Sequence, residues 1–259
     1  MPLKGKVLIC TGSTGIAAAA AHMAACGGAR LLLASPDEES AWELAAEVGA
    51  ECWVGDLTRP ASADSIVSQC LAKFGRVDAL FQAAGLSGRR FGDGPVHECT
   101  DRGWELTLAA NLSVVFHMSR AAIGRMLQQQ PGADGQRGSI VNLGSAIEQS
   151  PEPRHFAHHA YAAAKGAVVA LSRSMAAYYA PYGIRVNVVA PGLVRTPASA
   201  RSAADPELLD LLRKKQPLTD GMVEAGDVAR VALDLLADES RSITGQVIAV
   251  DGGWSVSSA

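Results

Sequence analysis

The 259-residue sequence has few aromatic side chains, few charges and no surplus of positive charge. Aromatic residues make up 5% of the chain and charged residues 19%, and the formal net charge is −3. A nucleic-acid binder needs a cationic surplus to neutralise phosphates, so we exclude nucleic acid as an expected partner. A disordered chain would be richer in charge and poorer in apolar residues than this one, which is 48% hydrophobic.

Long apolar runs and paired cysteines are also missing. The apolar run near the N-terminus, Val7 to Cys10, is too short for the core of a secretory signal and is better explained by a buried strand. No stretch approaches the roughly 18 apolar residues of a membrane-spanning helix, so we expect no membrane association. The five cysteines include no C-x-x-C pair, which favours reduced thiols in a cytoplasmic protein over a disulfide framework.

The chain instead shows a regular alternation of short β-rich runs with longer helical patterns. We expect strands at 6–10, 30–34, 51–54, 78–83, 139–143, 184–190 and 246–250. Helical patterns lie between them, at 15–26, from 37 onward, and at 61–74, 99–130, 160–179, 206–215 and 225–237. Strict alternation predicts βαβ units, and therefore an α/β fold with a doubly wound sheet of about seven parallel strands and helices on both faces.

The first strand leads into a glycine-containing turn and a helix start, with the sequence Thr11-Gly12-Ser13-Thr14-Gly15-Ile16. Glycines let the backbone turn sharply and approach a pyrophosphate, which then lies at the positive end of the helix. An ordinary tight turn between a strand and a helix is the alternative interpretation of these residues.

Further features follow in a fixed order along the chain: Asp56-Leu57, Ala83-Ala84-Gly85, Asn111, Ser145, Tyr161-x-x-x-Lys165 and Pro191-Gly192. In this order the chain resembles the short-chain dehydrogenase/reductase family, in its single-domain branch of about 250 residues. The resemblance covers essentially the whole chain and is most specific at 161–167, 184–192 and 243–254. It implies one Rossmann-type domain over 1–259, with a nucleotide-binding half at about 1–135 and a catalytic half at about 136–259.

The glycine turn departs from the family pattern T-G-x-x-x-G-x-G. Only two residues separate Gly12 from Gly15, and Ala17 stands where the pattern has its last glycine. The turn is therefore one residue short, and one position of close approach carries a methyl group. This departure favours an alternative function, in which a family member binds a ligand, a partner or a cofactor without turnover.

Tyr161 and Lys165 are four residues apart on an expected helix, so both side chains leave the same face. A free tyrosine has a pKa near 10 and is a poor base at neutral pH. We expect the lysine ammonium to favour the phenolate and lower the pKa of Tyr161, as general acid–base catalysis requires. Lys165 argues against a third alternative, a non-redox relative that has lost the lysine.

Ser145 follows an expected strand, where its hydroxyl can donate to a substrate carbonyl or, alternatively, cap a turn. Asn111 lies on an expected helix, where capping or buried hydrogen bonding is the alternative to a catalytic role. The resemblance implies a catalytic tetrad of Asn111, Ser145, Tyr161 and Lys165. It implies hydride transfer between NAD or NADP and a secondary alcohol or ketone, with Tyr161 as general acid/base and a water held by Asn111 in a proton relay to Lys165.

Cofactor choice depends on the end of the second strand, where the family places an acidic residue for NAD or a nearby arginine for NADP. Ser35 stands at this position, and no basic residue occurs from 31 to 58. The acids Asp37, Glu38 and Glu39 would repel a 2′-phosphate, which favours NAD, although they also suit a helix start. The complete set of cofactor-binding residues implied by the resemblance is Gly12, Ser13, Thr14, Gly15, Ile16, Ser35, Asp56, Leu57, Ala83, Ala84, Gly85, Tyr161, Lys165, Pro191, Gly192, Val194 and Thr196.

Three further features of the sequence lead to expectations about a histidine cluster, a lid segment and the oligomeric state. The cluster of His155, His158 and His159 is better explained as pocket lining or a solvated loop than as a metal site, because no second ligand pair has matching spacing. The segment 193–219 is expected to form a lid over a small-molecule alcohol or carbonyl substrate. The resemblance implies a homo-oligomer, a tetramer or dimer, with Trp254 and the last strand at a subunit contact.

Overall fold

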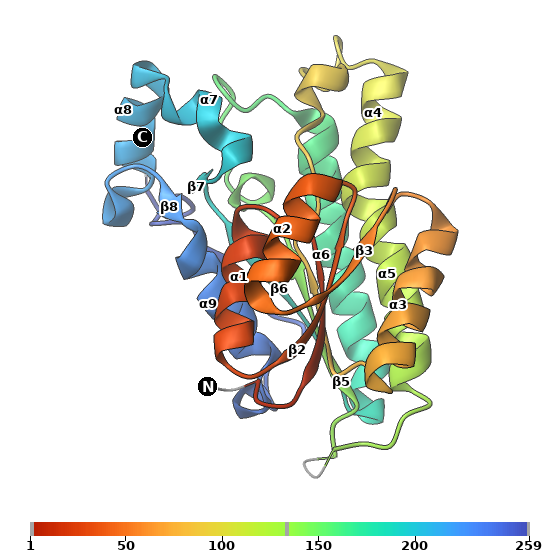
Figure 1. The fold of residues 1–259 in the computed structure, drawn as a ribbon. Coiled ribbons are helices and arrows are strands. Elements are labelled where there is room, and N and C mark those ends of the chain that lie inside the picture. The colour runs from red at the N-terminus through yellow and green to blue at the C-terminus, as the bar shows by residue number, and fades with distance from the viewer. Residues whose placement is uncertain (1–2, 133–134, 258–259) are drawn as a thin grey trace.

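The computed structural model describes residues 3–132 and 135–257, and a seven-stranded sheet forms its centre (Figure 1). The strand order is β3-β2-β1-β4-β5-β6-β9, and every neighbouring pair is parallel. This confirms the expected doubly wound parallel sheet. The strands are β1 (Val7–Thr11), β2 (Arg30–Ser35), β3 (Glu51–Val54), β4 (Ala79–Gln82), β5 (Gly138–Leu143), β6 (Ile184–Pro191) and β9 (Val247–Val250).

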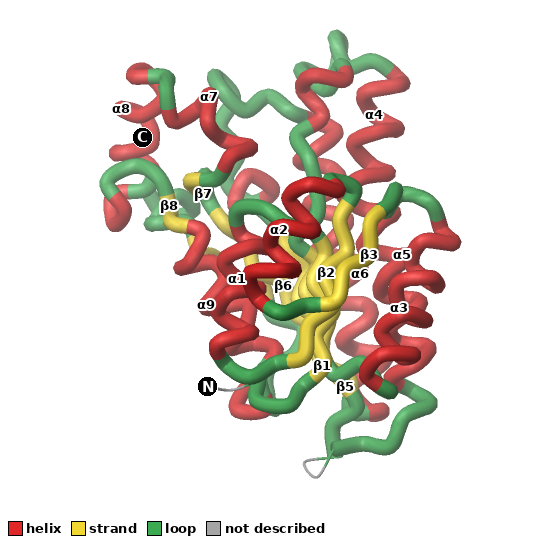
Figure 2. The backbone as a smooth tube through the Cα atoms, viewed as in Figure 1, coloured by secondary structure: helices red, strands yellow, loops and turns green. Residues whose placement is uncertain are grey.

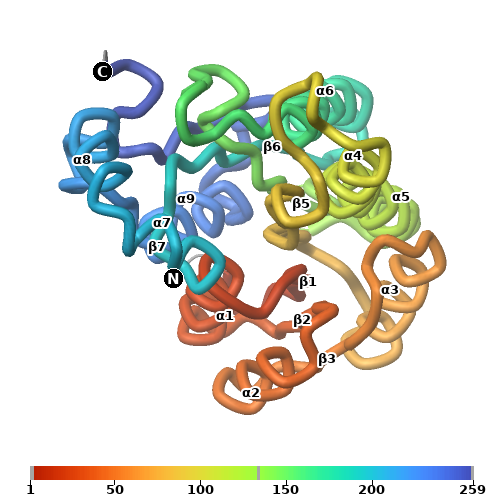
Figure 3. The backbone as a smooth tube through the Cα atoms, turned by 90° about the horizontal axis from the view of Figure 1, so that it is seen from above, coloured from red at the N-terminus to blue at the C-terminus, as the bar shows by residue number. Residues whose placement is uncertain are grey.

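Helices cover both faces of this sheet (Figure 3). One face carries α1 (Ile16–Cys26), α2 (Glu38–Val48) and α9 (Ala225–Leu236). The other carries α3 (Pro60–Phe74), α5 (Val114–Met126) and α6 (His159–Tyr179), with α4 (Asp101–Leu108) beside α6. The two layers agree with the helical patterns of the sequence.

Each central strand supplies side chains to both layers, because successive residues of a strand point to opposite faces. In β1, Leu8 and Cys10 pack with α1 and α9, whereas Val7 and Ile9 pack with α3 and α5. All four residues are fully buried. A strand buried on both faces reads as a continuous apolar run, which is why the run at the N-terminus is a core strand rather than a secretory signal.

A smaller group of elements stands above the carboxyl ends of the strands (Figure 2). It consists of β7 (Val194–Arg195), paired with β8 (Val223–Glu224), and of η5 (Pro197–Ser199), α7 (Ala200–Ala203), α8 (Pro206–Lys215) and η6 (Pro217–Thr219). Leu208 and Leu212 of α8 pack with Ala146, Met222 and Trp254 in a third apolar cluster. The expected lid segment therefore has its own small core.

Trp254 lies inside this cluster, not at a subunit surface. Its side chain is 3% exposed, and its indole N–H donates to the carbonyl of Ser150 over 2.8 Å. The indole of Trp254 is therefore not available for the expected subunit contact, because the segment between Ser145 and Tyr161 folds back onto it and covers it. The last strand, the other part of that expectation, leaves Ile248 36% exposed and stays a prediction.

Helical structure is continuous from α4 to α5 through a π-helical segment, η2 (Ala109–Ser113). By length and composition alone, the run Asp101–Met126 is long and apolar enough to cross a membrane. In the most apolar 18-residue stretch of this run, 44% is buried inside the protein. A core helix buried inside a protein can be equally long and apolar. Here α5 packs against α3 and the sheet.

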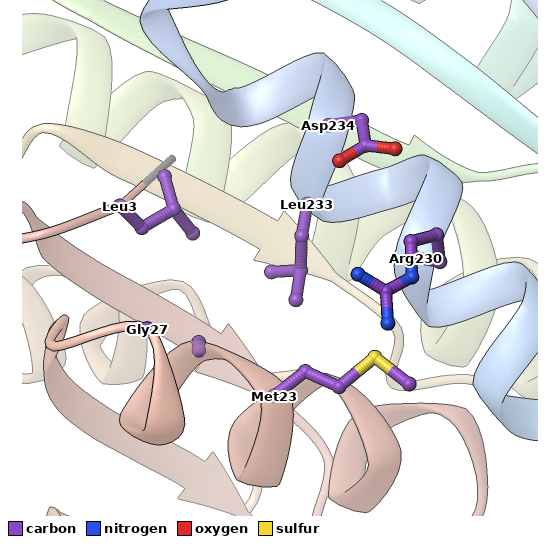
Figure 4. Close-up of a pocket in the computed structure, with 7 residues that line it drawn as sticks. Leu3, Met23, Gly27, Arg230, Leu233 and Asp234 are labelled. Carbon is purple, nitrogen blue, oxygen red and sulfur yellow. The ribbon is translucent and has the colours of Figure 1, made fainter. Parts of the chain in front are cut away.

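A shallow hollow lies between α1 and α9, near the N-terminal end of the described chain (Figure 4). Its lining residues are Leu3, Met23, Ala24, Gly27, Arg230, Leu233 and Asp234. Met23 lies near the end of α1 and Gly27 directly follows the helix, on the side remote from the glycine turn. The hollow is therefore at the opposite end of the sheet from the candidate site described next.

Candidate active site

The residues expected to bind a cofactor gather along one edge of the sheet, because parallel strands all present their carboxyl ends to the same side. The glycine turn follows β1, and Ser35 is the last residue of β2. Tyr161 and Lys165 belong to α6, and Pro191 ends β6. The remaining residues follow β3, β4 and β6, namely Asp56, Leu57, Ala83, Ala84, Gly85, Gly192, Val194 and Thr196.

The shortened turn adopts a backbone that favours glycine. Gly12 has φ +98° and Gly15 has φ +55°, in the region that L-residues rarely adopt. The N–H of Gly12 donates to the carbonyl of Ala34 over 2.8 Å. A Cβ on Gly12 would lie 3.1 Å from the methyl carbon of Ala17, which is itself 2% exposed. The methyl group of Ala17 is therefore accommodated inside the protein, against Gly12.

Thr196 lies directly on the glycine turn, although it comes from the far end of the sequence. A Cβ on Gly15 would lie 2.7 Å from Thr196 Cγ2. The side chains of Thr196 and Ser199 form a capping box at the start of η5, which fixes the position of Thr196. The structure thus brings Gly15 and Thr196 together, whereas the side chain of Val194 is buried in the layer of α1 and α9.

Three serine hydroxyl groups meet beside the turn. Ser13 Oγ lies 2.8 Å from Ser35 Oγ and 2.7 Å from Ser40 Oγ. The Asp37 carboxylate accepts the N–H of Ser40 and caps α2, so this acid does start a helix. The end of β2 therefore presents neutral hydroxyl groups, with the Asp37 carboxylate exposed next to them.

Asp56 makes its hydrogen bonds locally. Its Oδ1 accepts the N–H of Thr58 over 2.9 Å and the hydroxyl of Thr58 over 2.6 Å. These bonds, together with the Arg59 charge, hold the pKa of Asp56 below its usual value despite partial burial. Leu57, the next residue, is buried in the apolar layer beneath.

Asn111 lies in the π-helical segment η2, and its side chain points toward the carboxyl end of β4. Its Nδ2 donates to the carbonyls of Leu86, over 2.8 Å, and Thr107, over 2.9 Å. The side chain is fully buried, and its Oδ1 has no hydrogen-bond partner in the described part of the chain. A Cβ on Gly85 would lie 2.6 Å from Asn111 Oδ1 and 3.6 Å from Lys165 Nζ, so both atoms face the same small space.

Ser145, Tyr161 and Lys165 meet beside this space. Lys165 is 3% exposed, its Nζ donates to the carbonyl of Leu143 over 2.8 Å, and Nζ lies 5.5 Å from the centroid of the Tyr161 ring. The Ser145 side chain hydrogen-bonds to the Tyr161 phenol. Ser145 also accepts the N–H of Ile147 at 3.5 Å, the turn-capping role expected as its alternative. The structure brings all four expected tetrad residues together.

The pKa of Tyr161 differs from expectation. Burial raises it above its ordinary value, and the hydrogen bond from Ser145 lowers it by less. Burial also lowers the pKa of Lys165 to about 8. The expected lowering of the tyrosine pKa is wrong for the protein without cofactor. The lysine is desolvated, and its Nζ lies over the Tyr161 ring and donates to the Leu143 carbonyl rather than to the phenol oxygen.

The three histidines that precede Tyr161 contact different partners and do not converge on one point. His155 Nδ1 lies 3.5 Å from Glu152 Oε2, and the ring of His158 packs edge-on to Phe156. Burial, and then the Arg89 charge, lower the pKa of His158. Within residues 3–132 and 135–257, no group of three or more His, Cys, Asp or Glu side chains could hold a metal ion.

Asp93 is a residue that sequence reasoning missed. It lies in the loop after η1 (Gly88–Phe91) and is 5% exposed, yet its carboxylate accepts the N–H groups of Ala160 and Tyr161. An aspartate between two glycines reads as a turn residue, and nothing local in the sequence indicates a partner 67 residues away.

Comparisons with known proteins agree with this fold. A family model described as Enoyl-(Acyl carrier protein) reductase matches residues 11–255. The chain is 38% identical to "Inactive 2-(S)-hydroxypropyl-CoM dehydrogenase 2" of Xanthobacter autotrophicus, over 90% of this chain and 98% of that protein. It is 35% identical to a hydroxy-methyl-oxo-hexahydro-indene-carboxyl-CoA reductase of Mycobacterium tuberculosis, over 96% of this chain and 92% of that protein.

A solved structure is also similar over nearly the full length. The crystal structure of 3-ketoacyl-(acyl-carrier-protein) reductase from Brucella melitensis complexed with NADH has a TM-score of 0.86 and 28% sequence identity. The match covers 98% of this chain and 99% of that one. The chain therefore belongs to the short-chain dehydrogenase/reductase family, as its motifs predict. Family membership supports a general oxidoreductase role with a nicotinamide cofactor.

Proposed function

We propose that this protein interconverts a secondary alcohol and a ketone by hydride transfer with NAD or NADP, and that Tyr161 is the general acid/base. The observation that carries the proposal is the convergence of four side chains from three parts of the fold. Asn111 comes from η2, Ser145 from the loop after β5, and Tyr161 and Lys165 from α6. Lys165 Nζ and Asn111 Oδ1 face one space beside Gly85, and Ser145 bonds to the Tyr161 phenol.

The residues at the strand edge fit a dinucleotide. The glycines Gly12, Gly15, Gly85 and Gly192 present bare backbone at the carboxyl ends of the strands, and on the side where a Cβ would stand each packs against another residue of the site region: Ala17, Thr196, Asn111 and Gln216. The turn and the N-terminus of α1 would hold the pyrophosphate, because free N–H groups at a helix start favour anions. Lys165 would bind the nicotinamide ribose, with Pro191, Gly192 and Thr196 nearby and Ser35, Asp56 and Leu57 toward the adenosine. The bound nicotinamide would accept or supply the hydride.

The protein's own residues handle the proton. In alcohol oxidation the Tyr161 phenolate oxygen takes the hydroxyl proton as the carbinol carbon loses hydride, and in ketone reduction the phenol returns it. Ser145 orients the substrate oxygen through its hydroxyl. The free Oδ1 of Asn111, facing Lys165 Nζ, supports a water-linked path by which the lysine exchanges the proton with solvent.

We further propose a preference for NAD. The Ser13, Ser35 and Ser40 hydroxyl groups suit ribose hydroxyls, and the chain carries no basic residue from 31 to 58 to bind a 2′-phosphate. Turnover with NAD should exceed turnover with NADP at equal concentration, and a strong preference for NADP would refute this part of the proposal.

The wider assignments are also proposals. We infer a single domain over 1–259 that acts in the cytoplasm on a small-molecule alcohol or carbonyl compound and assembles into a dimer or tetramer. A soluble family fold, with one sheet built from strands along the whole chain, supports the first two. Screening sugars, polyols, 3-oxoacyl thioesters and steroid-like alcohols with both cofactors would identify the substrate.

A family member that binds without turnover is the second candidate function. The shortened turn supports it, and so does the relative named "Inactive". In that case cofactor titration would still give binding, but no alcohol or ketone in the screen would be converted.

The deciding experiment is Tyr161→Phe, with Tyr178→Phe as the matched control on the same helix. Tyr178 is 66% exposed, so its loss should leave turnover unchanged. Tyr161→Phe should abolish turnover and leave the calorimetric affinity for cofactor within about threefold, because only the proton-transferring hydroxyl is lost. Near-wild-type turnover in Tyr161→Phe would refute the assignment.

A further inference from the structure

The start of the catalytic helix α6 is held by a distant carboxylate. Asp93 Oδ1 accepts the N–H of Ala160 over 2.9 Å, and Oδ2 accepts the N–H of Tyr161 over 3.0 Å. Asp93 is 5% exposed, so both bonds are sheltered from water. One of the two amides belongs to the candidate acid/base itself.

Helix α6 has no cap of its own among the described residues. His158, at the capping position, makes no side-chain cap bond, and the first turn carries no acidic residue. The N–H of His159 donates to the carbonyl of Gly94 over 3.2 Å, and the helix's own bonding begins with Ala162 N–H to the His158 carbonyl. Residues 93 and 94 therefore satisfy the three N–H groups of 159–161 that the helix leaves open.

Asp93 is held in place by close packing against Gly88 and Gly103. Its N–H donates to the carbonyl of Gly88 over 3.1 Å. A Cβ on Gly88 would lie 2.8 Å from Asp93 Cβ, and a Cβ on Gly103 would lie 2.7 Å from Asp93 N. No larger side chain fits at either position without displacing Asp93, so its place is set by close packing as well as by hydrogen bonds.

Hydrogen bonds connect Gly103 to Asn111 through Thr107. The Thr107 hydroxyl donates to the carbonyl of Gly103 over 2.6 Å, and Asn111 Nδ2 donates to the carbonyl of Thr107 over 2.9 Å. Asp93 is thus connected to two site residues. Gly103 and Thr107 of α4 link it to Asn111, and the backbone amides of Ala160 and Tyr161 link it to the start of α6.

We propose that Asp93 is a positioning residue for Tyr161: by accepting two amides at the start of α6, it sets where the phenol lies relative to Ser145 and Lys165. This inference rests on the proposed function, since the position of Tyr161 matters only if Tyr161 reacts. Both carboxylate oxygens are in use, so an amide cannot replace the carboxylate. Asp93→Asn keeps one acceptor and turns an NH₂ group toward a backbone N–H.

The test compares Asp93→Asn and Asp93→Ala with Asp78→Asn. Asp78 is a matched control at the opposite end of the sheet. It is 9% exposed, and its carboxylate accepts the N–H of Val7 over 2.9 Å and the Nε–H of Arg76 over 2.7 Å. Calorimetric titration with NADH counts competent sites, so that kcat refers to folded protein only. Hydrogen exchange of a peptide covering 158–165 reports on the start of α6.

In Asp93→Asn we expect faster exchange in that peptide and a kcat per NADH site lower by about 10- to 100-fold, the effect of a displacement of about 1 Å in a reacting group. KM and the affinity for NADH should stay within about threefold, and Asp93→Ala should be at least as impaired. Asp78→Asn should lose thermal stability but keep kcat per site.

Two results would overturn the inference: unchanged exchange at 158–165 in Asp93→Asn, or equal loss of kcat per site in Asp93→Asn and Asp78→Asn. Wild-type protein that converts no substrate would instead count against the proposed function, and the exchange measurement would still decide whether Asp93 fixes the start of the helix.

Discussion

At the scale of single residues, the central feature is a phenol and an ammonium group desolvated side by side. Burial raises the pKa of Tyr161 and lowers that of Lys165 to about 8. Both shifts favour the uncharged side chain, yet with a pKa of about 8 the Lys165 ammonium still keeps its charge at pH 7, whereas Tyr161 stays a neutral phenol. The hydrogen bond from Ser145 acts in the opposite direction on Tyr161 and favours the phenolate.

The Ser145 bond predicts a change in the pH profile of alcohol oxidation. Activity should rise with pH as Tyr161 loses its proton, because the phenolate is the base. Ser145→Ala removes a bond that lowers the pKa of Tyr161, so the rise should move to higher pH in addition to a loss of rate. The measurement is kcat/KM against pH for both proteins, and a profile lower in height but unshifted would contradict the prediction.

Gly15 tests the shortened turn. Gly15→Ala places a methyl group 2.7 Å from Thr196 Cγ2 in a backbone of positive φ, so we expect a loss of stability of about 1–3 kcal/mol and weaker cofactor binding. Gly49→Ala is the matched control, since its φ is +67° and a Cβ there meets nothing within 4 Å. It should lower the melting temperature without changing the calorimetric affinity. Equal affinities in the two variants would argue against a cofactor at the turn.

Which site residues the sequence reveals depends on the range of their contacts. Tyr161 and Lys165 are found from spacing on one helix, and Gly12 and Gly15 from their place between a strand and a helix. Asp93 is not found this way, and neither is the contact of Thr196 with Gly15, because each joins segments remote in sequence. Likewise, the pKa of Tyr161 depends on burial by the whole fold, which the local pattern cannot supply.

At the scale of elements, the seven strands fall within one residue of their expected bounds at each end. Local signals that begin and end the helices between the strands help to explain this accuracy. Asp37 caps α2 and Asp205 caps α8, while Gly49 and Gly75 end α2 and α3 in the left-handed conformation. The π-helical segment 109–113 carries no such signal, since its form depends on the buried contacts of Asn111.

The lid elements depend on one buried amide. Gln216, fully buried at the end of α8, accepts the N–H of Leu193 over 2.6 Å and donates to the carbonyls of Leu193 and Gly221. It therefore joins the start of the lid segment to its end, next to Gly192.

Gln216→Ala should destabilise the protein by about 1–3 kcal/mol, raise protease sensitivity within 196–215 and lower activity, because three backbone groups lose their partner. Gln129→Ala is the matched control at the opposite edge, where Gln129 bonds to the backbone of Val77 and Arg137. It should lower the melting temperature without opening the lid to protease. Protection of the lid in Gln216→Ala would show that this amide does not hold it.

At the scale of the whole molecule, the layer of α4, α5 and α6 leaves aromatic side chains uncovered. Trp104 is 43% exposed, Phe116 44% and Tyr178 66%. Large exposed apolar side chains on one layer suit a contact between proteins if they form a continuous patch. This layer, rather than Trp254, is where we expect the subunits of the proposed oligomer to meet.

Sedimentation velocity should give a mass two or four times 26.8 kDa. Phe116→Glu should shift the distribution toward the monomer, because a carboxylate would be desolvated at the contact. Trp42→Glu, on α2 of the opposite layer, should not, although Trp42 is 55% exposed. A monomeric wild type, or a shift only in Trp42→Glu, would contradict this placement.

The cap on α6 has a consequence for the order of folding. Asp93 and the amide of Tyr161 are 68 residues apart, so the first turn of α6 cannot reach its native form through local bonds alone. The loop that carries Asp93 must meet the start of α6 across this length of chain, which is a non-local step. A folding chain therefore cannot carry out the proposed chemistry until these distant segments have met, and recovery of activity should mark a late stage of assembly rather than the first collapse.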